Sequence, residues 1–231
     1  KNNFQKIKKL IVNYPNNSIS VKLSSINFNR NYAEELTKLA IDNKSKILID
    51  AENFTIQEKI NNISDLLMKN FNKNNVNVFK TYQMYRKDSM ELLKNDFSQP
   101  RDYYIGCKLV RGAYFNEDKK NDILFDKIFD THNNYDNSID FLSNKMKNND
   151  VLICATHNDK SIRRAIEIIK EKSLKNIEFA HLLGMSDYLS EELAQNYKVY
   201  KYLPFGNFKD TIPYLIRRLY ENYPMILNLF K

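Results

Sequence analysis

Seven short apolar runs, separated by stretches of helical periodicity, constrain the fold of this 231-residue chain more than any other feature. Strands that alternate with helices of about 10 to 15 residues indicate βαβ units and a parallel sheet. The predicted strands are Ile19–Leu23, Lys46–Asp50, Val76–Tyr82, Tyr104–Val110, Val151–Thr156, Ile177–Leu182 and Lys198–Leu203. The predicted helices are Tyr32–Ile41, Gln57–Phe71, Lys87–Asn95, Tyr135–Lys147, Ser161–Lys172, Leu189–Tyr197 and Thr211–Tyr223. Lys1–Lys9 begins a further amphipathic stretch that is compatible with a helix.

Polar side chains stand in or just after nearly every predicted strand. They are Lys22, Asp50, Glu52, Gln83, Lys108, Arg111, Thr156, His157, Asn158, His181 and Tyr202. An open sheet gathers ligands at one switch point, whereas every strand of a (β/α)8 barrel ends at the same mouth. The distribution therefore predicts an α/β fold of the distorted (β/α)8 TIM-like type. A closed barrel needs eight strands, so we expect either that one strand is hidden or that the chain lacks its first unit. No repeat or linker divides residues 1–231, which predicts one domain.

Composition excludes several classes of site. The four glycines fit neither the dinucleotide fingerprint G-x-G-x-x-G nor a Walker A loop. No apolar run approaches the roughly 18 residues of a membrane-spanning helix. The net charge of +8 suggests nucleic acid as a partner, but 32 Asn residues and dispersed Lys residues favour a solvated surface instead. Cys107 and Cys154 lie in apolar runs and are expected to be buried thiols.

The segment Lys108–Tyr114 (KLVRGAY) is the most distinctive candidate site. In a strand Lys108 and Arg111 point to opposite faces. Gly112 would let the backbone approach a ligand closely, and Tyr114 would bring an aromatic ring to the mouth. Two cations and an aromatic ring around a glycine suit an anionic, planar ligand. A solvated strand end with an ordinary turn is the alternative.

A second candidate is Thr156–Asn158, which precedes a predicted helix capped by Asn158 or Asp159. The free N–H groups of that helix start could hold a phosphate without glycines. For His157, a structural histidine and a ligand contact remain equally open. Cys154 and His157 form a C-x-x-H pair, but without a second pair we expect no metal site.

The last predicted helix places Arg217 and Arg218 within reach of Glu221, at i,i+4 and i,i+3 spacing. Braced in this way, two guanidiniums form a carboxylate clamp. An ordinary surface salt bridge would have the same spacing. The pair Arg163–Arg164 is also helical and is expected to have no function, so spacing alone does not separate the two pairs.

Seven ordered segments together resemble the catalytic barrel of the proline dehydrogenase family, and they resemble its eukaryotic, mitochondrial branch more than bacterial proline utilization A. They cover about residues 19–222 and are VKLS (21–24), IDAE (49–52), TYQMYRKD (81–88), KLVRGAY (108–114), ATHN (155–158), EFAHLLGM (178–185) and KYLPFG…PYLIRRLYEN (201–222). The family's first strand carries an L-G-E segment that has no counterpart before Ile19. The resemblance therefore implies that the seven strands are the second to the eighth.

The resemblance implies oxidation of L-proline to Δ¹-pyrroline-5-carboxylate with hydride transfer to FAD, and it also implies roles for individual residues. The implied catalytic residues are Asp50, Lys108 and Tyr202, with Lys in place of the family's usual Arg at position 108. The implied substrate-binding residues are Lys22, Tyr114, Tyr202, Arg217, Arg218 and Glu221. The implied FAD-binding residues are Ala51, Gln83, Lys108, Arg111, Gly112, Ala113, Phe115, Thr156, His157 and Asn158.

The family further implies a quinone or other membrane electron acceptor, peripheral membrane association and a mitochondrial location. Because Tyr202 would pack on the proline ring, we expect proline to be preferred over hydroxyproline. A rival reading is a Schiff-base lyase or aldolase that uses Lys22 or Lys108 as the amine. A non-catalytic or nucleic-acid-binding module is a third possibility, supported only by the charge.

Overall fold

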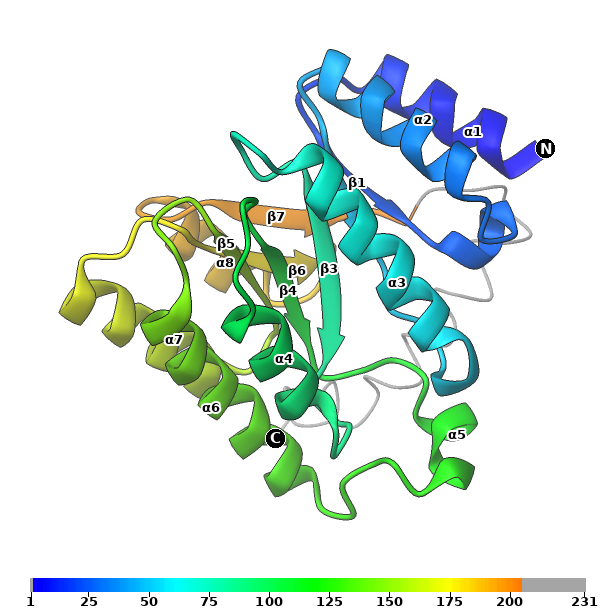
Figure 1. Ribbon diagram of the computed structural model, residues 1–231. Helices are drawn as coiled ribbons and strands as arrows, with labels where there is room; N and C mark the ends of the chain where they lie inside the picture. Colours follow the sequence, from blue (N-terminus) through cyan, green and yellow to red (C-terminus); the bar gives the residue numbers. More distant parts are fainter. Residues whose placement is uncertain (1, 205–231) are drawn as a thin grey trace.

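A computed structural model describes residues 2–204 and contains a seven-stranded parallel sheet with the strands in chain order (Figure 1). Each strand is paired in parallel with the next, from β1 with β2 through β6 with β7. The strands are β1 Ser18–Val21, β2 Lys46–Ile49, β3 Val78–Gln83, β4 Gly106–Val110, β5 Val151–Ala155, β6 Ile177–Leu182 and β7 Val199–Tyr202. The predicted parallel α/β architecture is therefore confirmed.

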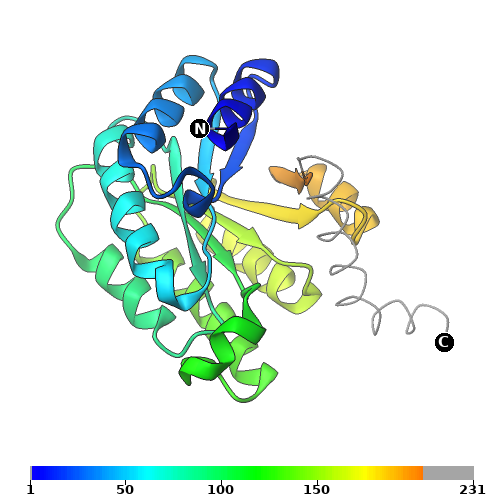
Figure 2. The ribbon, with the colours of Figure 1, turned by 90° about the vertical axis from the view of Figure 1, so that its right-hand side faces the viewer.

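Helices connect the strands and cover the convex side of the curled sheet (Figures 1 and 2). The α-helices are α1 Asn2–Asn13, α2 Arg30–Asp42, α3 Phe54–Phe71, α4 Ser89–Ser98, α5 Phe115–Asp118, α6 Ile128–Lys145, α7 Asp159–Lys172 and α8 Asp187–Ala194. Two 3₁₀ helices, η1 Leu23–Ile26 and η2 Lys119–Asn121, complete the order. A right-handed series of βα units of this kind is a (β/α)8-type half-barrel, in which the carboxyl ends of all strands face one mouth.

The predicted strand boundaries are shifted at several ends. β1 stops at Val21, so that Lys22 caps η1 rather than lying in the strand, whereas β3 starts two residues later than predicted and includes Gln83. These shifts follow from hydrogen-bond pairing with neighbouring strands, which a run of apolar letters does not define.

The start of α6 was predicted seven residues too late, at Tyr135 instead of Ile128. The first turns of α6 bury polar residues, Thr131 and Asn134, and therefore lack an apolar stripe. Asn134 donates through Nδ2 to the carbonyl of Met84 at 2.8 Å and to Oγ of Ser89 at 2.8 Å. Buried polar groups with satisfied hydrogen bonds can occupy core positions. The helix therefore begins before the stretch in which apolar residues recur at helical spacing.

The convex face of β3 carries a buried charge. Lys80 is 1% exposed and its Nζ contacts both carboxylate oxygens of Asp65 in α3 at 2.8 and 3.0 Å. The same Nζ contacts Asp96 in α4 at 2.6 Å, and Asp96 also accepts from the hydroxyl of Tyr82. Two carboxylates flanking one ammonium group satisfy its donors between the strand and the two helices.

A buried ion pair between Arg101 and Asp150 connects the segments that precede β4 and β5, at the amino ends of these strands. Their side chains are 3% and 0% exposed, and Asp150 accepts from both Nη atoms of Arg101, at 2.8 and 2.6 Å. Asp150 also accepts from the backbone N–H of Ile105 and of Lys147. This cluster was not anticipated from the sequence, because Asp150 lies in an Asn-rich loop that looks solvent-exposed.

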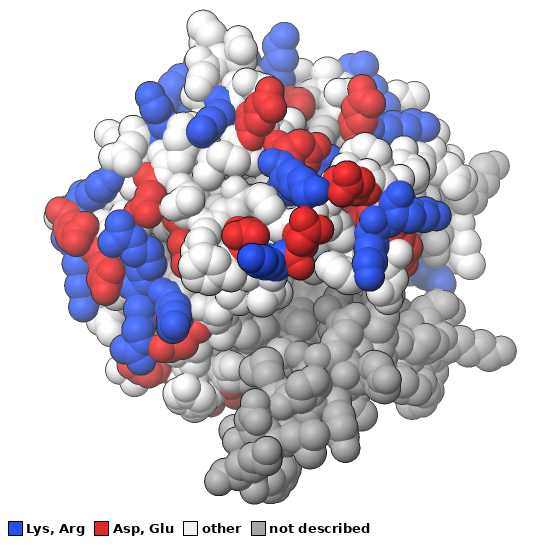
Figure 3. Space-filling model, turned by 90° about the horizontal axis from the view of Figure 1, so that it is seen from below, with Lys and Arg blue, Asp and Glu red and all other residues white. Residues whose placement is uncertain are grey.

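The surface shown in Figure 3 intersperses Lys and Arg with Asp and Glu, without a broad region of one sign. That distribution is what a solvated surface with scattered charges predicts. Within residues 2–204 there is no helix whose length and apolar character would let it cross a membrane.

Candidate active site

Lys108 and Asp50 form an ion pair that joins two strands which are not neighbours in the sheet. Nζ of Lys108, in β4, lies 2.8 Å from Oδ1 of Asp50, which directly follows β2. Strand β3 lies between β2 and β4, so both side chains must project onto the concave side of the sheet. The side chains are only 10% and 18% exposed. The structure therefore brings together two predicted site residues that are 58 positions apart.

Lys22 and Tyr114 make a second contact across the mouth, from the end of β1 to the loop after β4. Nζ of Lys22 donates to Oη of Tyr114 at 2.6 Å and lies 5.2 Å from the ring centroid. Burial opposes the charge of Lys22, but the bond to Tyr114 and the charges of Asp50 and Glu52 outweigh it and raise the pKa of Lys22. Lys22 is therefore a stable cation that keeps solvent access at the mouth.

Buried hydrogen bonds hold the loop after β2, which carries Asp50 and Ala51. Nε2 of Gln83 donates to the carbonyl of Glu52 at 2.9 Å. The Glu52 carboxylate in turn accepts from the backbone N–H of Ser24 at 3.1 Å and from its hydroxyl at 2.5 Å. Gln83 and Glu52 are 4% and 5% exposed. These bonds fix the backbone that follows Asp50.

Gly112 is needed for a close approach of the Tyr85 ring, and its predicted approach to a ligand stays a prediction. Gly112 has a φ of 143°, and a Cβ there would lie 2.5 Å from the Tyr85 ring. The hydroxyl of Tyr85 donates to Asp118 at 2.6 Å, and the other oxygen of Asp118 accepts from the N–H of Phe54 at 2.7 Å. Burial and the adjacent Asp118 carboxylate raise the pKa of Tyr85, so its hydroxyl remains a donor. Asp118, which the sequence did not single out, thus anchors the loop that carries Tyr114.

Arg111 lies just past β4, and its guanidinium is directed away from Lys108 towards β5 and α7, as the alternation predicts. Its Nε donates to Nδ1 of His132 at 2.8 Å, and Nη1 and Nη2 donate to the hydroxyls of Thr156 and Ser161. The guanidinium carbon lies 4.5 Å from the ring centroid of Tyr135. All these acceptors are neutral, and burial lowers the pKa of Arg111.

Asn158 is the N-cap of α7, as predicted, and its Oδ1 accepts from the N–H of Ser161 at 3.1 Å. His157 has a structural role here, because its Nε2 accepts from the N–H of Leu182 at 3.1 Å. Its ring lies 5.0 Å from that of His181. Burial, His181 and Lys201 lower the pKa of His157 to about 4, so the ring is neutral at physiological pH.

The remaining predicted site residues occupy the same end of the sheet. Ala51 follows β2, Ala113 and Phe115 follow β4 and are exposed, and Tyr202 ends β7. The predicted clamp of Arg217, Arg218 and Glu221 lies outside the described residues. In the comparison pair, Arg163 contacts Asp159 and Arg164 contacts Asp140 on the helical surface.

Cys107 and Cys154 are both free and fully buried, in agreement with the prediction. Burial raises the pKa of both thiols, and that of Cys154 reaches about 12. They are therefore not reactive thiolates. Among residues 2–204, no group of three or more His, Cys, Asp or Glu side chains is arranged to hold a metal ion.

Comparison with known sequences gives one family. The family described as "Proline dehydrogenase" matches residues 1–225. The chain is 36% identical over 214 residues to mitochondrial proline dehydrogenase 1 of Dictyostelium discoideum, and the match covers 84% of this chain and 37% of that protein. It is 38% identical over 198 residues to mitochondrial proline dehydrogenase 2 of Arabidopsis thaliana, covering 78% and 42%. A hydroxyproline dehydrogenase of Xenopus laevis is 33% identical over 215 residues, covering 85% and 46%.

Solved structures show the same fold at lower identity. Proline utilization A from Bdellovibrio bacteriovorus aligns with a TM-score of 0.80 and 20% identity, covering 88% of this chain and 24% of that one. A mutant of proline utilization A from Bradyrhizobium japonicum aligns with a TM-score of 0.81 and 22% identity, covering 95% and 26%. The chain spans only about a third of the length of the first curated relatives, at 37%, 33% and 31%.

Proposed function

The chain belongs to the proline dehydrogenase family, and from that premise we propose that it carries the catalytic barrel of a flavin-dependent enzyme that oxidises L-proline to Δ¹-pyrroline-5-carboxylate. The observation that carries this proposal is the pair of contacts across the mouth, Lys108–Asp50 and Lys22–Tyr114. Both pairs join strand ends that are distant in sequence, and together they line one concave polar surface. A small zwitterion with one carboxylate and one amine suits such a surface.

The residues around Arg111 fit the pyrophosphate and ribityl part of FAD. Arg111 has five N–H donors, and three of them are bonded to neutral acceptors, so two remain without an acceptor among the described residues. No carboxylate within residues 2–204 makes an ion pair with Arg111, and the start of α7 adds oriented N–H groups beside it. A guanidinium without a direct carboxylate partner, beside a helix N-terminus, favours an anion. We therefore assign Arg111, Thr156, His157 and Asn158 to this part of FAD, with Gly112 shaping the loop.

The family resemblance implies that Ala51, Gln83, Lys108 and Phe115 would hold the isoalloxazine part, whereas Ala113 would join Arg111 at the other part of FAD. The flavin supplies the two-electron oxidation of the substrate's C–N bond, a step that amino-acid side chains do not perform alone. The chain's own contribution is orientation of the substrate and exclusion of water.

Lys22, with its raised pKa, supplies a permanent positive charge for the proline carboxylate. Tyr114 holds the Lys22 ammonium in place and presents its ring to the substrate. Arg217, Arg218 and Glu221 complete the carboxylate site in this proposal, although they lie outside the described residues. Tyr202 forms the wall beside the proline ring.

Asp50 and Lys108 act together as the catalytic pair in this proposal. Lys108 bonds to Oδ1 of Asp50 and, among the described residues, Oδ2 has no protein donor. Oδ2 is therefore placed to accept the proton of the substrate amine before its C–H bond is oxidised. Lys108 meanwhile keeps the carboxylate oriented through the bond to Oδ1.

The Schiff-base alternative is disfavoured by the state of its two candidate amines. A nucleophilic lysine needs a lowered pKa, whereas that of Lys22 is raised and Lys108 is engaged with Asp50. Borohydride reduction in the presence of substrate should therefore trap no adduct.

The decisive experiment is the absorption spectrum of the purified protein with and without L-proline. We expect a flavin band that bleaches anaerobically when L-proline is added. A folded, full-length protein that takes up no flavin would refute the proposal. The same experiment with 4-hydroxy-L-proline tests the substrate, because one relative is named a hydroxyproline dehydrogenase. Equal rates of bleaching with both compounds would contradict the role of Tyr202.

We further propose a mitochondrial location, a quinone acceptor and peripheral association with the membrane. The support is that several relatives are named mitochondrial proline dehydrogenases. Fractionation of cells should recover the full-length protein with mitochondrial membranes and release it with salt or carbonate. Recovery in another compartment would overturn the location.

A further inference from the structure

We propose that His132 is a positioning residue that holds Arg111 in the orientation needed to bind the anionic part of the flavin, and that it does so only as a neutral ring. This inference rests on the proposed flavin site. His132 lies in the first turns of α6, outside every segment that carries the family resemblance.

The geometry of the contact fixes the protonation state of His132. Nε of Arg111 is always a donor, and it lies 2.8 Å from Nδ1 of His132. Nδ1 must therefore present a lone pair, so that the proton of the neutral ring resides on Nε2. A protonated ring would place an N–H and a positive charge against the guanidinium, and the hydrogen bond could not form.

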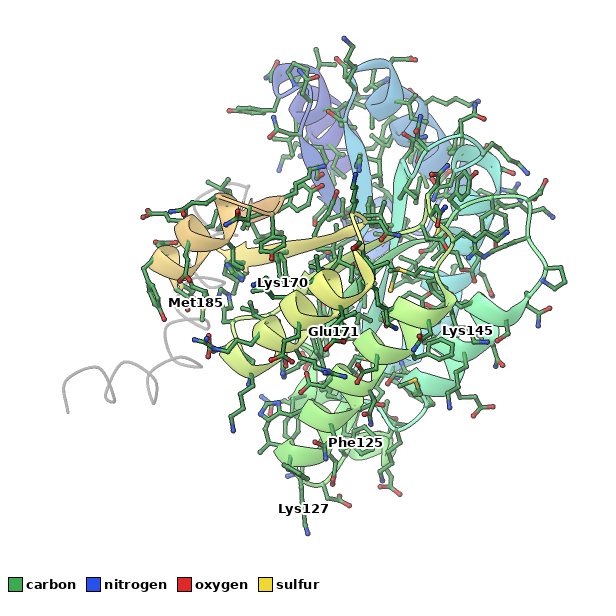
Figure 4. The ribbon with its side chains drawn as sticks, turned by 90° about the vertical axis from the view of Figure 1, so that its left-hand side faces the viewer. Phe125, Lys127, Lys145, Lys170, Glu171 and Met185 are labelled. Carbon is green, nitrogen blue, oxygen red and sulfur yellow. The ribbon has the colours of Figure 1, made fainter. Side chains whose placement is uncertain are left out.

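Helix α6 also supplies Tyr135 and Asp136 to the surroundings of the guanidinium, while Thr156 follows β5 and Ser161 lies in α7. Tyr135 lies beneath the guanidinium at 4.5 Å. Asp136 accepts from the hydroxyl of Ser161, which itself accepts from Nη2 of Arg111 at 2.9 Å. Figure 4 shows α6 and α7 side by side on the convex side of the sheet, with Lys127 at the start of α6 and Lys170 and Glu171 on α7. The side chains that contact Arg111 from α6 and α7 therefore lie where these two helices pack together, at the helix ends that face the mouth.

The three hydrogen bonds of Arg111 to His132, Thr156 and Ser161 determine the direction of its other N–H donors. Nε is held by His132, one N–H of Nη1 by Thr156 and one N–H of Nη2 by Ser161. A guanidinium is planar, so fixing these three donors fixes the direction of the remaining two. Loss of the Nε acceptor would let the plane rotate and would weaken a bidentate contact with a phosphate.

The surroundings of His132 favour the neutral ring. Burial, the charge of Arg111 and that of Lys160 on α7 lower the pKa of His132, and Asp136 opposes them. These are the charged groups that face the ring from β4, α6 and α7. The transition to the protonated ring is therefore expected below the ordinary histidine pKa of about 6.5.

The test is the dissociation constant of FAD from the flavin-depleted, full-length protein, measured by fluorescence quenching between pH 5 and 8. For the parent protein we expect the dissociation constant to rise roughly tenfold as the pH falls through the pKa of His132, because the protonated ring no longer accepts from Nε and repels the guanidinium. His132→Asn retains a neutral acceptor on a short side chain, so we expect near-parental affinity at pH 8 and little change with pH. His132→Ala should bind roughly fivefold more weakly at pH 8, also without pH dependence.

Asn133→Ala is the matched control, because Asn133 is exposed on the same turn of α6. It should follow the parental curve, and thermal unfolding of each variant at each pH establishes that folding is retained. If His132→Asn keeps the parental pH dependence, or if affinity increases at low pH, the positioning role is wrong. If the parent protein binds no FAD at any pH, the proposed function fails instead, so the two failures are distinguishable.

Discussion

Substitution of Asp150 by Asn should destabilise the protein strongly although the site lies at the other end of the barrel. The Asp150 side chain is 0% exposed and accepts four hydrogen bonds. Asn has the same size as Asp but no charge, and its NH₂ group would face N–H donors that the Asp150 carboxylate accepts from. Arg101, 3% exposed, would then be a buried cation without a counter-ion.

The expected loss is about 3 to 5 kcal/mol of unfolding free energy, the usual range for removing one partner of a buried ion pair. A domain of this kind has only about 5 to 15 kcal/mol in total, so Asp150→Asn should be marginally stable. The assay is urea unfolding followed by circular dichroism, with the shift read from the midpoint at an unchanged slope.

Two further variants make the measurement specific. The exposed pair Lys73–Asp102, with side chains 44% and 77% accessible, serves as the control, and Asp102→Asn should change stability by less than about 0.5 kcal/mol. The double substitution Arg101→Met with Asp150→Asn removes both charges but keeps an oxygen acceptor for backbone N–H groups, and it should recover part of the loss. A loss below about 1 kcal/mol for Asp150→Asn would refute the reasoning, because the pair would then contribute no more than a surface contact.

Three other predictions concern the mouth and the sheet. Gly106→Ala should lower the free energy of unfolding by roughly 2 to 3 kcal/mol in urea, because its Cβ would lie 2.4 Å from the carbonyl oxygen of Val78. Gly184→Ala is the control, since Gly184 has a φ of 78° and no atom within 4 Å of an added Cβ, and it should lower the free energy of unfolding by only about 1 kcal/mol. Equal losses would contradict the steric argument. Tyr114→Phe removes the acceptor for Lys22 and should raise KM for proline several-fold, because one hydrogen bond to a charged group is lost. The effect on kcat should be smaller. An unchanged KM in steady-state assays would exclude a role of Tyr114 in positioning Lys22. The pKa of His157 falls from 6.5 to about 4 on folding, so the unfolded chain binds more protons and the free energy of unfolding should decrease below pH 6.5. The full shift corresponds to about 3 kcal/mol, and solvent screening of the partly exposed ring reduces the expected loss to roughly 1 to 2 kcal/mol at pH 4. His157→Gln should reduce this pH dependence in urea titrations at a series of pH values, and an unchanged pH dependence would assign it to other groups.

Much of the fold was predictable because its signals are local. The apolar runs that became β2, β5 and β6 were located within a residue or two, since strands buried on both faces are nearly continuous in hydrophobicity. The start of α6 was missed because Thr131 and Asn134 bury polar groups where a helix normally shows an apolar stripe. The ion pair of Arg101 and Asp150 was missed for the same reason, because a charged letter in a polar loop gives no sign of burial.

The candidate site was predictable in its residue types and less so in its contacts. Lys108 and Asp50 were expected at one mouth, and the structure adds that they are bonded to each other. Gly112 was expected to let the backbone approach a ligand, and the structure adds that the ring of Tyr85 packs against it. The role of His132 had no signal in the sequence, because its only mark is a lone pair directed at Arg111.

The sequence by itself determined the order of strands and helices and the end of the sheet at which the chemistry gathers, because hydrophobic period and strand direction are properties of neighbouring residues. Only the tertiary structure decided which side chains meet. Lys22 reaches Tyr114 across 92 positions because the sheet curls, and the curl arises from the twist and register of successive strand pairs. Those quantities depend on packing between all the layers at once, and no short stretch of sequence contains them.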